Sequence, residues 1–415
     1  MEGIEVRRSL APDGGEGLFS RRAWKAGELL LKDPYLARLE AEAFDKEDSM
    51  LLAKAYSNIT GTGELARLLE SDEGRALWPG PPDDYRRAAF EKCVEATYTE
   101  GSVDAKAKRV QAMCVFSYNS YMTQDGGRYH TVFPNISKAN HCCDPNCWVV
   151  VPESAPGEVV SVRSIAAEDE LTVSYLCRSD LLRSVRGRQK MLKSGWEFTC
   201  CCRRCASDVD DSRRFSCSRC VEARGTNTTS TSSSITPTGE GESLLAAVKS
   251  CCFALNAPGE DDASADGGCD LKVTACAACG ARPSSSELTE WRQREIEVED
   301  LLEALPEGLY AAWATCEDFA KDHPFHGLSG RWKNFIARRT LSEAAEAETE
   351  EEKWALQQEA EEHRQALQLC MAEVLHEDFT DAAADQNLDD VPALPLPGKL
   401  PPLQPQRASS SSSSS

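Results

Sequence analysis

The segment NHCCDPNC, residues 140–147, carries three cysteines and a proline within eight residues. Clustered cysteines can fill a core, form disulfides, bind a metal ion or act as nucleophiles, and each role implies a different kind of protein. The start of the chain lacks the apolar region of a secretory signal, and no apolar run reaches the ~18 residues of a membrane span. We therefore expect a cytoplasmic or nuclear protein. Thiols stay reduced there, so the 19 cysteines should be metal ligands, core residues or reactive thiols rather than disulfides.

A second cluster, FTCCCRRC, has the spacing C-x-C-x-x-C at Cys200, Cys202 and Cys205. This spacing lets thiolates meet at one tetrahedral ion, and all-thiolate, four-coordinate sites favour zinc. Three thiolates need a fourth ligand from elsewhere, and Cys143 in the first segment is the natural candidate. The alternative, a set of buried thiols, is disfavoured by the spacing. We predict a zinc site that fixes residues 200–205 against residues 140–147.

Two C-x-x-C pairs follow, Cys217 with Cys220 and Cys276 with Cys279. Pairs of this kind are typical of a structural zinc ribbon, although a long stretch rich in serine and threonine separates them here. The sequence therefore predicts a second zinc site. The alternative is that these residues are ordinary thiols.

The remaining cysteines and histidines are harder to assign. Cys251, Cys252 and Cys269 have no clear partner, so we expect them to be core residues or free thiols. The segment CEDFAKDHPFH, residues 316–326, holds one cysteine and two histidines that could form part of a metal site. A loop capped by histidine and proline is the favoured interpretation.

The elements that must position these residues follow from hydrophobic periodicity. Short apolar or alternating runs rich in valine predict strands in residues 4–38 and 116–176. Apolar residues at three- and four-residue spacing predict helices in residues 41–115 and from 286 to about 379. The segment SDLLRSVRGRQKMLKSG is predicted to be one helix, with Ser179 as its N-cap.

The charge of the chain limits its partners. The net charge is −22 and the sequence pI is about 4.8. A protein that wraps duplex nucleic acid normally shows a basic surface, so a purely zinc-dependent nucleic-acid binder fits poorly. An acidic surface suits a basic partner such as a lysine-rich protein tail, although the same acidity would also serve solubility alone.

Motifs along the chain occur in the order typical of SET-domain protein lysine methyltransferases: GEGLFS, YNSY, NHCCDPNC, DELTVSY and FTCCCRRC. The chain resembles this family, and within it the SET-and-MYND branch, over about residues 4–205. The pattern N-H-x-C-x-P-N, followed by E-L-T-x-x-Y and C-x-C-x-x-C, is a highly specific combination.

The resemblance implies an α+β fold. Its core is the β-clip of the SET domain, made of small curved sheets, with a helical insertion, a zinc-bound post-SET segment and an α-helical C-terminal region. The expected divisions are the N-terminal part of the SET domain (1–40), helical insertion (41–115), SET core (116–178), helix and cysteine-rich post-SET zinc segment (179–220), low-complexity insert (221–248), second cysteine segment (249–285), helical C-terminal domain (286–380) and disordered Pro/Ser tail (381–415).

The resemblance also implies a reaction, the transfer of a methyl group from S-adenosylmethionine to the ε-amine of lysine in a protein or peptide. The substrate would be a histone tail or a non-histone protein, and no direct nucleic-acid or membrane partner is expected. Tyr175 matches the catalytic tyrosine and Phe198 an aromatic residue that packs on the adenine. Cys143, Cys200, Cys202 and Cys205 match the zinc ligands near the active site. The positions that match cofactor contacts are Gly15, Glu16, Gly17, Asn119, Asn140, His141, Tyr175 and Phe198.

This chemistry is an in-line displacement, for which the lysine must be neutral and aligned with the methyl group at about 3 Å. The hydroxyl of Tyr175 could stabilise charge at that point. The alternative role for Tyr175 is that of a core residue at a strand end. Its place within DELTVSY favours catalysis.

The chain also departs from the branch. Residues 39–113 contain a single cysteine, Cys93, so we do not expect the MYND finger there. Cys142 stands where serine is usual, and Trp196 stands where a tyrosine often lines the lysine channel. The bulkier ring without a hydroxyl leaves open the substrate and the number of methyl groups transferred. A catalytically weak SET scaffold that binds partners through its C-terminal helices is therefore the alternative function.

Overall fold

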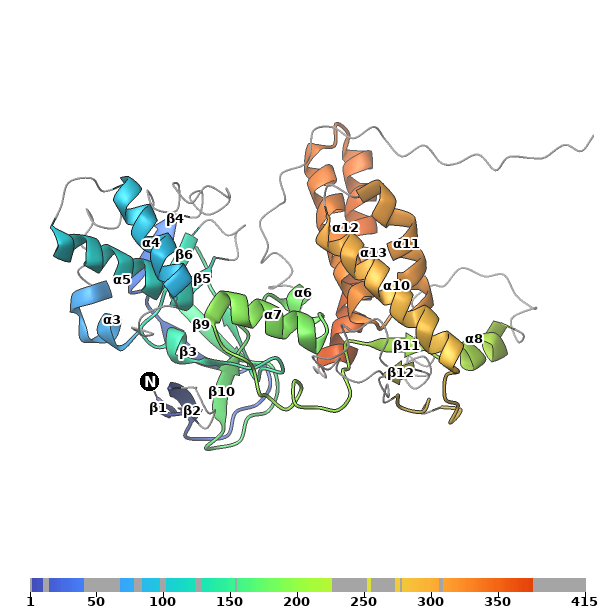
Figure 1. Ribbon diagram of the computed structural model, residues 1–415, viewed down its shortest axis with the longest axis horizontal. Helices are drawn as coiled ribbons and strands as arrows, with labels where there is room; N and C mark the ends of the chain where they lie inside the picture. The colour runs from blue at the N-terminus through green and yellow to red at the C-terminus, as the bar shows by residue number, and fades with distance from the viewer. Residues whose placement is uncertain are drawn as a thin grey trace, which may run out of the picture.

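The computed structural model describes residues 2–9, 15–40, 68–77, 84–97, 102–123, 129–153, 155–225, 252–254, 273–276, 278–305 and 309–375. Figure 1 shows strands β1–β10 and helices α3–α5 on one side, helices α10–α13 on the other, and α6 and α7 between them. Within these residues no helix combines the length and hydropathy needed to cross a membrane.

The N-terminal half is built on small sheets. One sheet has the order β1-β2-β10-β7, in which β10 pairs in parallel with β7 and antiparallel with β2. The others have the orders β3-β9-β8 and β4-β6-β5. The strands are β1 Ile4–Arg8, β2 Glu16–Ser20, β3 Leu29–Asp33, β4 Ala37–Glu40, β5 Ser120–Met122, β6 Tyr129–Val132, β7 Asn140–His141, β8 Cys147–Val150, β9 Gly157–Ser161 and β10 Glu170–Val173.

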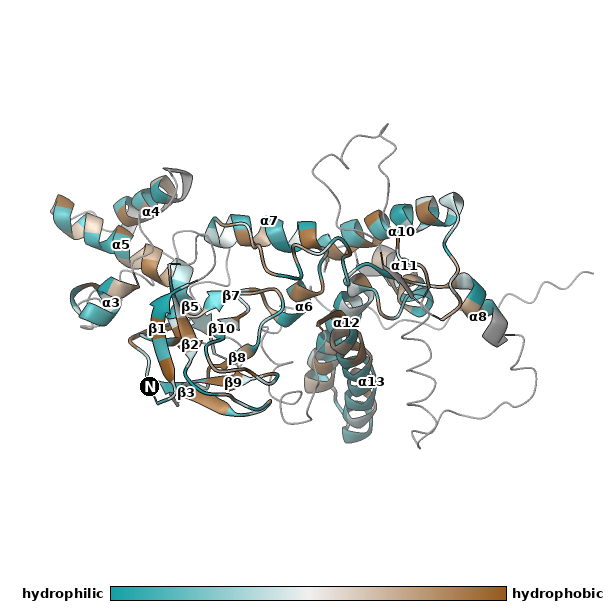
Figure 2. Cartoon of the chain, turned by 90° about the horizontal axis from the view of Figure 1, so that it is seen from below, coloured by the Kyte–Doolittle hydropathy of each residue, from teal (hydrophilic) through white to brown (hydrophobic). Residues whose placement is uncertain are grey.

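A hydrophobic core lies between the first two sheets. Leu18 of β2, Leu171 of β10 and Val159 of β9 are all buried in it. Figure 2 shows the corresponding hydrophobic stretches on β3, β8 and β9. The buried carboxylate of Asp33 accepts backbone N–H bonds of 2.8 Å from Asn135 and Ile136 and so fixes the short 3-10 helix Ile136–Lys138, which leads directly into β7.

The helical insertion covers the third sheet. The described helices are α3 Asp72–Ala76, α4 Asp84–Thr97 and α5 Val103–Asn119. Ser102 caps α5 by accepting from the backbone N–H of Ala105, and the run Ala112–Phe116 of this helix is buried. Helix α5 continues to Asn119, past the expected end of the helical segment at 115, and passes straight into β5.

The segment predicted as one helix is two, so that prediction was wrong. Helix α6 is Arg178–Leu181 and α7 is Val185–Trp196. Ser184 rather than Ser179 is the side-chain cap, because its Oγ accepts the N–H of Gly187. The break is fixed by a distant residue: the buried carboxylate of Asp210 accepts the N–H of Val185 at 2.6 Å.

The C-terminal half is a helical body with a small two-stranded ribbon. A capping box of Ser284 and Glu287 starts the first long helix, α10. The ribbon pairs β11 with β12 antiparallel. The elements are β11 Arg214–Ser216, α8 Ser218–Gly225, β12 Cys252–Ala254, α10 Ser285–Glu303, α11 Leu309–Asp322, α12 Gly327–Glu346 and α13 Glu350–Leu375.

This body packs tightly on the N-terminal half. A Cβ on Gly327 at the start of α12 would overlap the carbonyl oxygen of Leu182, and a Cβ on Gly330 would lie 2.6 Å from the Leu182 side chain. The end of α13, including Leu367 and Met371, shares a buried core with Cys143 and other residues of the first cysteine cluster. The C-terminal helices therefore support the segment that carries NHCCDPNC.

A buried ion pair joins Arg213, the residue just before β11, to Glu295 of α10. Arg213 donates to both carboxylate oxygens of Glu295, at 2.7 and 2.6 Å, and His326 Nε2 lies 3.3 Å from the same carboxylate. Burial alone would raise the pKa of Glu295, but the hydrogen bonds and charge of Arg213, with His326 behind them, hold it at about 2.

Replacing this carboxylate should destabilise the helical body. A Glu295→Gln variant removes the negative charge that the buried guanidinium of Arg213 contacts, so we expect a loss of about 3–5 kcal/mol in the free energy of unfolding. Folding lowers the pKa of Glu295 from its ordinary 4.5. The contribution of its charge to the free energy of unfolding is therefore complete above pH 4.5 and is lost as the pH falls through about 2. Denaturant unfolding followed by tryptophan fluorescence at pH 7, 4 and 3 measures both effects. Equal stability of the two proteins at pH 7 would refute this account of the pair.

Candidate functional site

The candidate site lies where β7 and β10 run side by side. Their parallel pairing places Thr172 opposite Asn140 and Val173 opposite His141. The N–H of Cys142 donates to the carbonyl of Val173 at 2.9 Å and extends this pairing by one residue. The motifs NHCCDPNC and DELTVSY, separated in the chain, thus become neighbours.

Tyr175 is held at both ends by residues 139–141. Its backbone N–H donates to His141 Nδ1 at 3.0 Å, and its hydroxyl donates to the carbonyl oxygen of Ala139 at 3.0 Å. Burial, with a smaller effect from the charge of Glu170, raises the pKa of Tyr175 above its ordinary value of 10.0. The hydroxyl therefore stays protonated at neutral pH, with its proton directed to Ala139.

Aromatic rings surround this tyrosine. The ring centroid of Tyr175 lies 5.4 Å from that of Trp196, 6.2 Å from that of Phe198 and 5.4 Å from that of His141. Phe198 also lies 5.9 Å from His141. Tyr121 packs against the same core as Tyr175, and its pKa is raised by burial and then by Tyr175. The result is an apolar, aromatic-walled site with buried hydroxyl groups.

Two hydrogen bonds between the end of α5 and the end of α7 hold two of these rings in place. Glu197 follows α7 with a φ of 65°, so its backbone is left-handed and turns the chain between Trp196 and Phe198. The hydroxyl of Tyr118, near the end of α5, donates to the Glu197 carboxylate, and Trp196 Nε1 donates to the Tyr118 carbonyl at 3.3 Å. Neither Tyr118 nor Glu197 was predicted from the sequence as a site residue. Tyr118 lies in the quoted motif YNSY, but nothing local links it to Glu197.

A third residue that the sequence did not predict is Glu170, which organises the chain around Gly17. Asn140 Nδ2 donates to Glu170 Oε1 at 2.8 Å and to the carbonyl of Glu16 at 3.0 Å, and Ser9 Oγ donates to the same carboxylate. A Cβ on Gly17 would overlap Glu170 Oε1 and lie 2.9 Å from Asn140 Nδ2. Glycine is therefore required for the close approach of these elements.

The other predicted contact positions have different surroundings. Gly15 has a φ of +56°, and its carbonyl accepts the N–H of Ser9. Glu16 pairs with Lys138 at 3.4 Å. Asn119 Nδ2 donates to the carbonyls of Leu77 and Val115, at 3.1 and 2.9 Å. These bonds tie Asn119 to the helical insertion.

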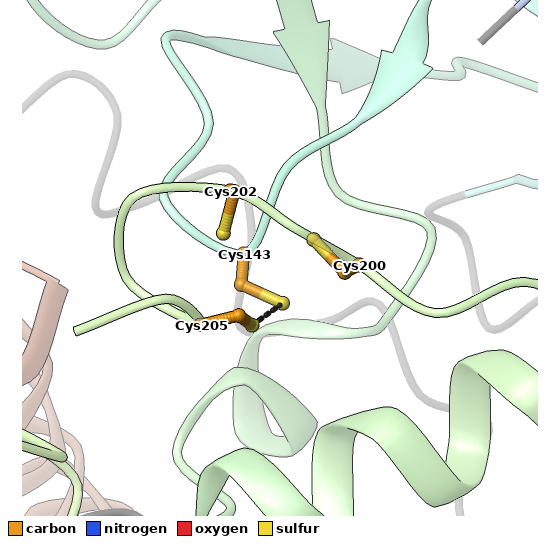
Figure 3. A group of neighbouring side chains, drawn as sticks. All are labelled: Cys143, Cys200, Cys202 and Cys205. Atoms are coloured by element: carbon orange, nitrogen blue, oxygen red, sulfur yellow. Dashed lines mark hydrogen bonds between the residues drawn. The ribbon is translucent and has the colours of Figure 1, made fainter. Parts of the chain in front are cut away.

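The first cysteine cluster belongs to a buried core against which Tyr175 packs. The ligand atoms of Cys143, Cys200, Cys202 and Cys205 all lie within 4.8 Å of one another, and Cys205 Sγ lies 3.4 Å from Cys143 Sγ (Figure 3). Zinc-bound thiolates stand about 3.8 Å apart, because zinc–sulfur bonds are about 2.3 Å long, whereas a disulfide needs about 2.05 Å. The four sulfur positions fit a tetrahedral ion.

The surroundings of this cluster also fit a metal. Four thiolates and one Zn²⁺ carry a net charge of −2, and buried guanidinium groups stand beside them. Arg204 donates to the Cys143 carbonyl at 2.9 Å, and Arg188 Nη2 lies 3.8 Å from Cys205 Sγ. His141 Nε2 lies 3.2 Å from Cys143 Sγ. Because His141 Nδ1 accepts from Tyr175, its Nε2 carries the proton and donates toward that sulfur.

The second predicted set also converges. Cys217, Cys220, Cys276 and Cys279 form the other group of possible ligands that the described residues contain. Cys251 and Cys269 lie outside the described residues, and Cys252 contributes its backbone to β12.

The histidines of residues 316–326 are structural. His326 Nδ1 accepts the N–H of Leu328 and caps α12, whereas His323 Nδ1 accepts the N–H of Ser216. Burial, with the nearby His326 and Arg294, lowers the pKa of His323 to about 3. These contacts agree with the capped loop that the sequence favoured over a metal site.

Comparison with known families identifies the fold around Tyr175. Residues 15–176, which run from the start of β2 to just past the DELTVSY motif, match the family model described as SET domain. The chain contains a SET domain. The match starts at the Gly15–Gly17 turn and includes the paired strands β7 and β10. The α+β fold expected from the sequence is confirmed, with small sheets, a C-terminal helical region and cysteine clusters able to hold zinc.

Curated relatives of the SET domain align over shorter stretches. "Histone-lysine N-methyltransferase SMYD3" of Mus musculus is 38% identical over 81 residues, 19% of this chain and 18% of the relative. "N-lysine methyltransferase SMYD2-B" of Xenopus laevis is 32% identical over 96 residues, 22% of this chain and 21% of the relative. The chain therefore spans about a fifth of the length of these relatives. A solved structure, "Crystal structure of the SET domain of LSMT bound to Lysine and AdoHcy", aligns with a TM-score of 0.31 and 10% identity over 94% of this chain and 88% of the other.

Proposed function

We propose that the chain transfers a methyl group from S-adenosylmethionine to the ε-amine of a lysine in a protein substrate. The observation that carries this proposal is Tyr175, whose protonated hydroxyl is fixed by Ala139 inside an aromatic wall. The matched relatives support it, since those named above are described as lysine methyltransferases. The acidic chain favours a basic partner, such as a histone tail, over direct nucleic-acid binding.

The cofactor would lie against the Gly15–Gly17 turn, Asn140, His141 and Phe198. The sulfonium group of bound S-adenosylmethionine supplies an activated methyl. Asn140 donates its amide hydrogens to Glu16 and Glu170, which leaves its side-chain oxygen as an acceptor. Phe198 offers a ring face next to His141, with which it is in contact. The predicted cofactor contact from Asn119 stays a proposal, because its side-chain amide donates to the carbonyls of Leu77 and of Val115 in α5.

Tyr175 would align and stabilise the reacting groups rather than remove a proton. Its raised pKa keeps it neutral across the range in which enzymes usually work, so it cannot act as a general base there. With its proton donated to Ala139, the hydroxyl oxygen presents lone pairs to positive charge at the methyl and the amine. The aromatic wall disfavours the ammonium form of lysine through desolvation, so the amine is better able to react.

The first cysteine set would hold zinc as a scaffold. Cys200, Cys202 and Cys205 come soon after Phe198 in the sequence, and Cys143 comes two positions after His141. One ion would therefore hold the segment of Phe198 against the segment of His141. All four positions are cysteine, and such closed sites are structural. The ion therefore takes no part in methyl transfer.

A Gly17→Ala variant should weaken binding of S-adenosylmethionine. The new Cβ overlaps Glu170 and displaces Asn140, so the turn loses one or two hydrogen bonds; the affinity should fall by about tenfold. Calorimetric titration measures the change. A matched control is Gly195→Ala in α7, where a Cβ would meet no atom within 4 Å and affinity should be unchanged. Unchanged affinity in both variants would contradict the role of this turn.

The alternative function is a scaffold with little catalysis. The observation that favours it is Trp196, whose ring occupies the wall beside Tyr175 and is tied to Tyr118 through Nε1. In that case the chain would act by binding partner proteins, and removing the Tyr175 hydroxyl would leave that binding unchanged.

Methyl transfer is tested with radiolabelled S-adenosylmethionine, the full chain, purified core histones and an array of lysine-containing peptides. Mass spectrometry of digested products should locate the methyl group on a lysine. A chain that binds S-adenosylmethionine but labels neither histones nor peptides would favour the scaffold.

A further inference from the structure

We propose that Cys217, Cys220, Cys276 and Cys279 bind a second zinc ion that organises the C-terminal helical body and is independent of methyl transfer. The site lies outside the SET domain match, which ends at residue 176. Its existence therefore rests on its own geometry and does not depend on the proposed reaction.

The sulfur positions fit one tetrahedral ion. Cys217 Sγ lies 3.6 Å from Cys279 Sγ, Cys220 Sγ lies 3.8 Å from Cys276 Sγ, and all four lie within 4.8 Å of one another. These separations are close to the roughly 3.8 Å between thiolates on zinc and far from the roughly 2.05 Å of a disulfide. Each close pair joins one C-x-x-C segment to the other, as a shared ion requires.

The backbone of each pair is folded into a tight turn. The N–H of Val221 donates to the Cys217 carbonyl at 3.0 Å, which brings Cys220 back toward Cys217. In the other pair, the N–H of Gly280 donates to the Cys276 carbonyl at 2.8 Å, and Gly280 has a φ of +66°. That left-handed conformation favours glycine and lets the chain return after Cys279. Both pairs thus present their sulfur atoms to the same point.

Burial indicates a structural rather than a catalytic ion. Cys217 and Cys276 are buried within the hydrophobic core of the C-terminal body, whereas Cys279 lies at the surface. Four cysteines fill a tetrahedral shell and leave no position for water or substrate. The site would therefore stabilise the fold without activating a ligand.

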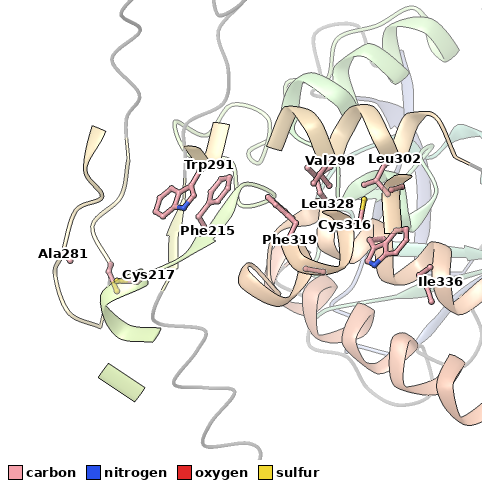
Figure 4. Packing of buried hydrophobic residues seen from close by; sticks show 14 residues of the cluster. Phe215, Cys217, Ala281, Trp291, Val298, Leu302, Cys316, Phe319, Leu328 and Ile336 are labelled. Carbon is pink, nitrogen blue, oxygen red and sulfur yellow. The ribbon is translucent and has the colours of Figure 1, made fainter. Parts of the chain in front are cut away.

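The ion would connect the ribbon to α10. Phe215, two residues before Cys217, stacks on Trp291 of α10 at 5.0 Å with a ring angle of 9° (Figure 4). Ala281, whose carbonyl accepts the N–H of Cys276, belongs to the same buried core. Next to Cys217, Ser218 Oγ donates to the capping residue Glu287 at 2.7 Å. Zinc at this point fixes the start of α10 against β11, and through them the core around Phe319.

Metal analysis tests the proposal. Purified wild-type chain should contain two zinc ions per chain by mass spectrometry, and Cys276→Ser/Cys279→Ser should contain one. The double variant should melt at a lower temperature but bind S-adenosylmethionine with affinity within about twofold of wild type. The matched control is Cys201→Ser, which changes an exposed cysteine outside both sets and should retain two ions. The second site would be overturned if the double variant still contained two zinc ions. It would also be overturned if wild type contained only one ion and the double variant kept that ion.

A second measurement covers the case in which the double variant does not fold. Wild-type protein reconstituted with Co²⁺ should show the absorption of tetrahedral cobalt thiolate sites, with an intensity that corresponds to two ions per chain. An intensity of one ion, lost in Cys202→Ser/Cys205→Ser, would overturn the proposal. The proposed methyl transfer is judged separately, since it fails only if S-adenosylmethionine binding or lysine methylation is missing.

Discussion

A Tyr175→Phe variant should lose methyl transfer by about 10²–10³-fold, the loss usual when one preorganised polar group is removed from a transition state. The ring remains to pack against Trp196 and Phe198, but no oxygen faces the methyl and the amine. The effect should therefore fall on kcat, with binding of S-adenosylmethionine close to that of wild type. Steady-state kinetics on a peptide that the wild-type chain methylates measures kcat. Calorimetry on the same samples measures the affinity for S-adenosylmethionine.

Two readouts separate catalysis from simple packing. Loss of the bond to the buried Ala139 carbonyl should lower the free energy of unfolding by about 1–3 kcal/mol, so the variant should stay folded at assay temperature. The exposed Tyr35→Phe serves as the control and should retain full activity. A Tyr175→Phe protein with wild-type kcat would show that the hydroxyl is a core group and would remove the central residue of the proposed mechanism.

Removing the first cysteine set should have the other large effect. Cys202→Ser/Cys205→Ser should lose one zinc ion and also lose detectable binding of S-adenosylmethionine. Cys143 and Cys200 share a core with Phe198, Trp196 and the end of α13. Without the ion, the segment of Phe198 would therefore no longer be held against the segment of His141. Metal content and calorimetry measure the two losses together.

Comparison with the second set makes this result specific. Both double variants should lose one ion, but only Cys202→Ser/Cys205→Ser should lose cofactor binding. The exposed Cys201→Ser tests whether any cysteine change in this segment has the same effect. A Cys202→Ser/Cys205→Ser protein that loses zinc and still binds S-adenosylmethionine normally would show that the ion does not organise the site.

The sequence predicted those parts of the site that depend on local spacing. C-x-C-x-x-C and the two C-x-x-C pairs bring sulfur atoms together through tight turns, and the structure places both predicted sets within ligand distance. NHCCDPNC and DELTVSY were singled out by their resemblance to the SET-domain family, whereas the pairing of β7 with β10 that brings His141 to Tyr175 was not predicted. Turns within each cysteine motif need few contacts from elsewhere in the chain.

The parts that the sequence did not predict depend on distant residues. Ser179 and Ser184 are equally good caps locally, and the choice is made by Asp210, a residue of a different segment. Glu170 and Asn140 are 30 positions apart, and their bond exists only because β10 is paired with β7. The hydrogen bond from Tyr118 to Glu197 joins residues that are 79 positions apart. Hydrophobic periodicity reports which side of an element is buried and not which distant polar group meets it.

The most direct test of the proposed function is calorimetric titration of the purified full chain with S-adenosylmethionine, with zinc content measured on the same sample. We expect saturable binding of one molecule in the micromolar range that is usual for enzyme ligands, by a protein with two zinc ions. A folded, zinc-loaded chain that releases no heat at millimolar S-adenosylmethionine would contradict the assignment of the Tyr175 site to methyl transfer.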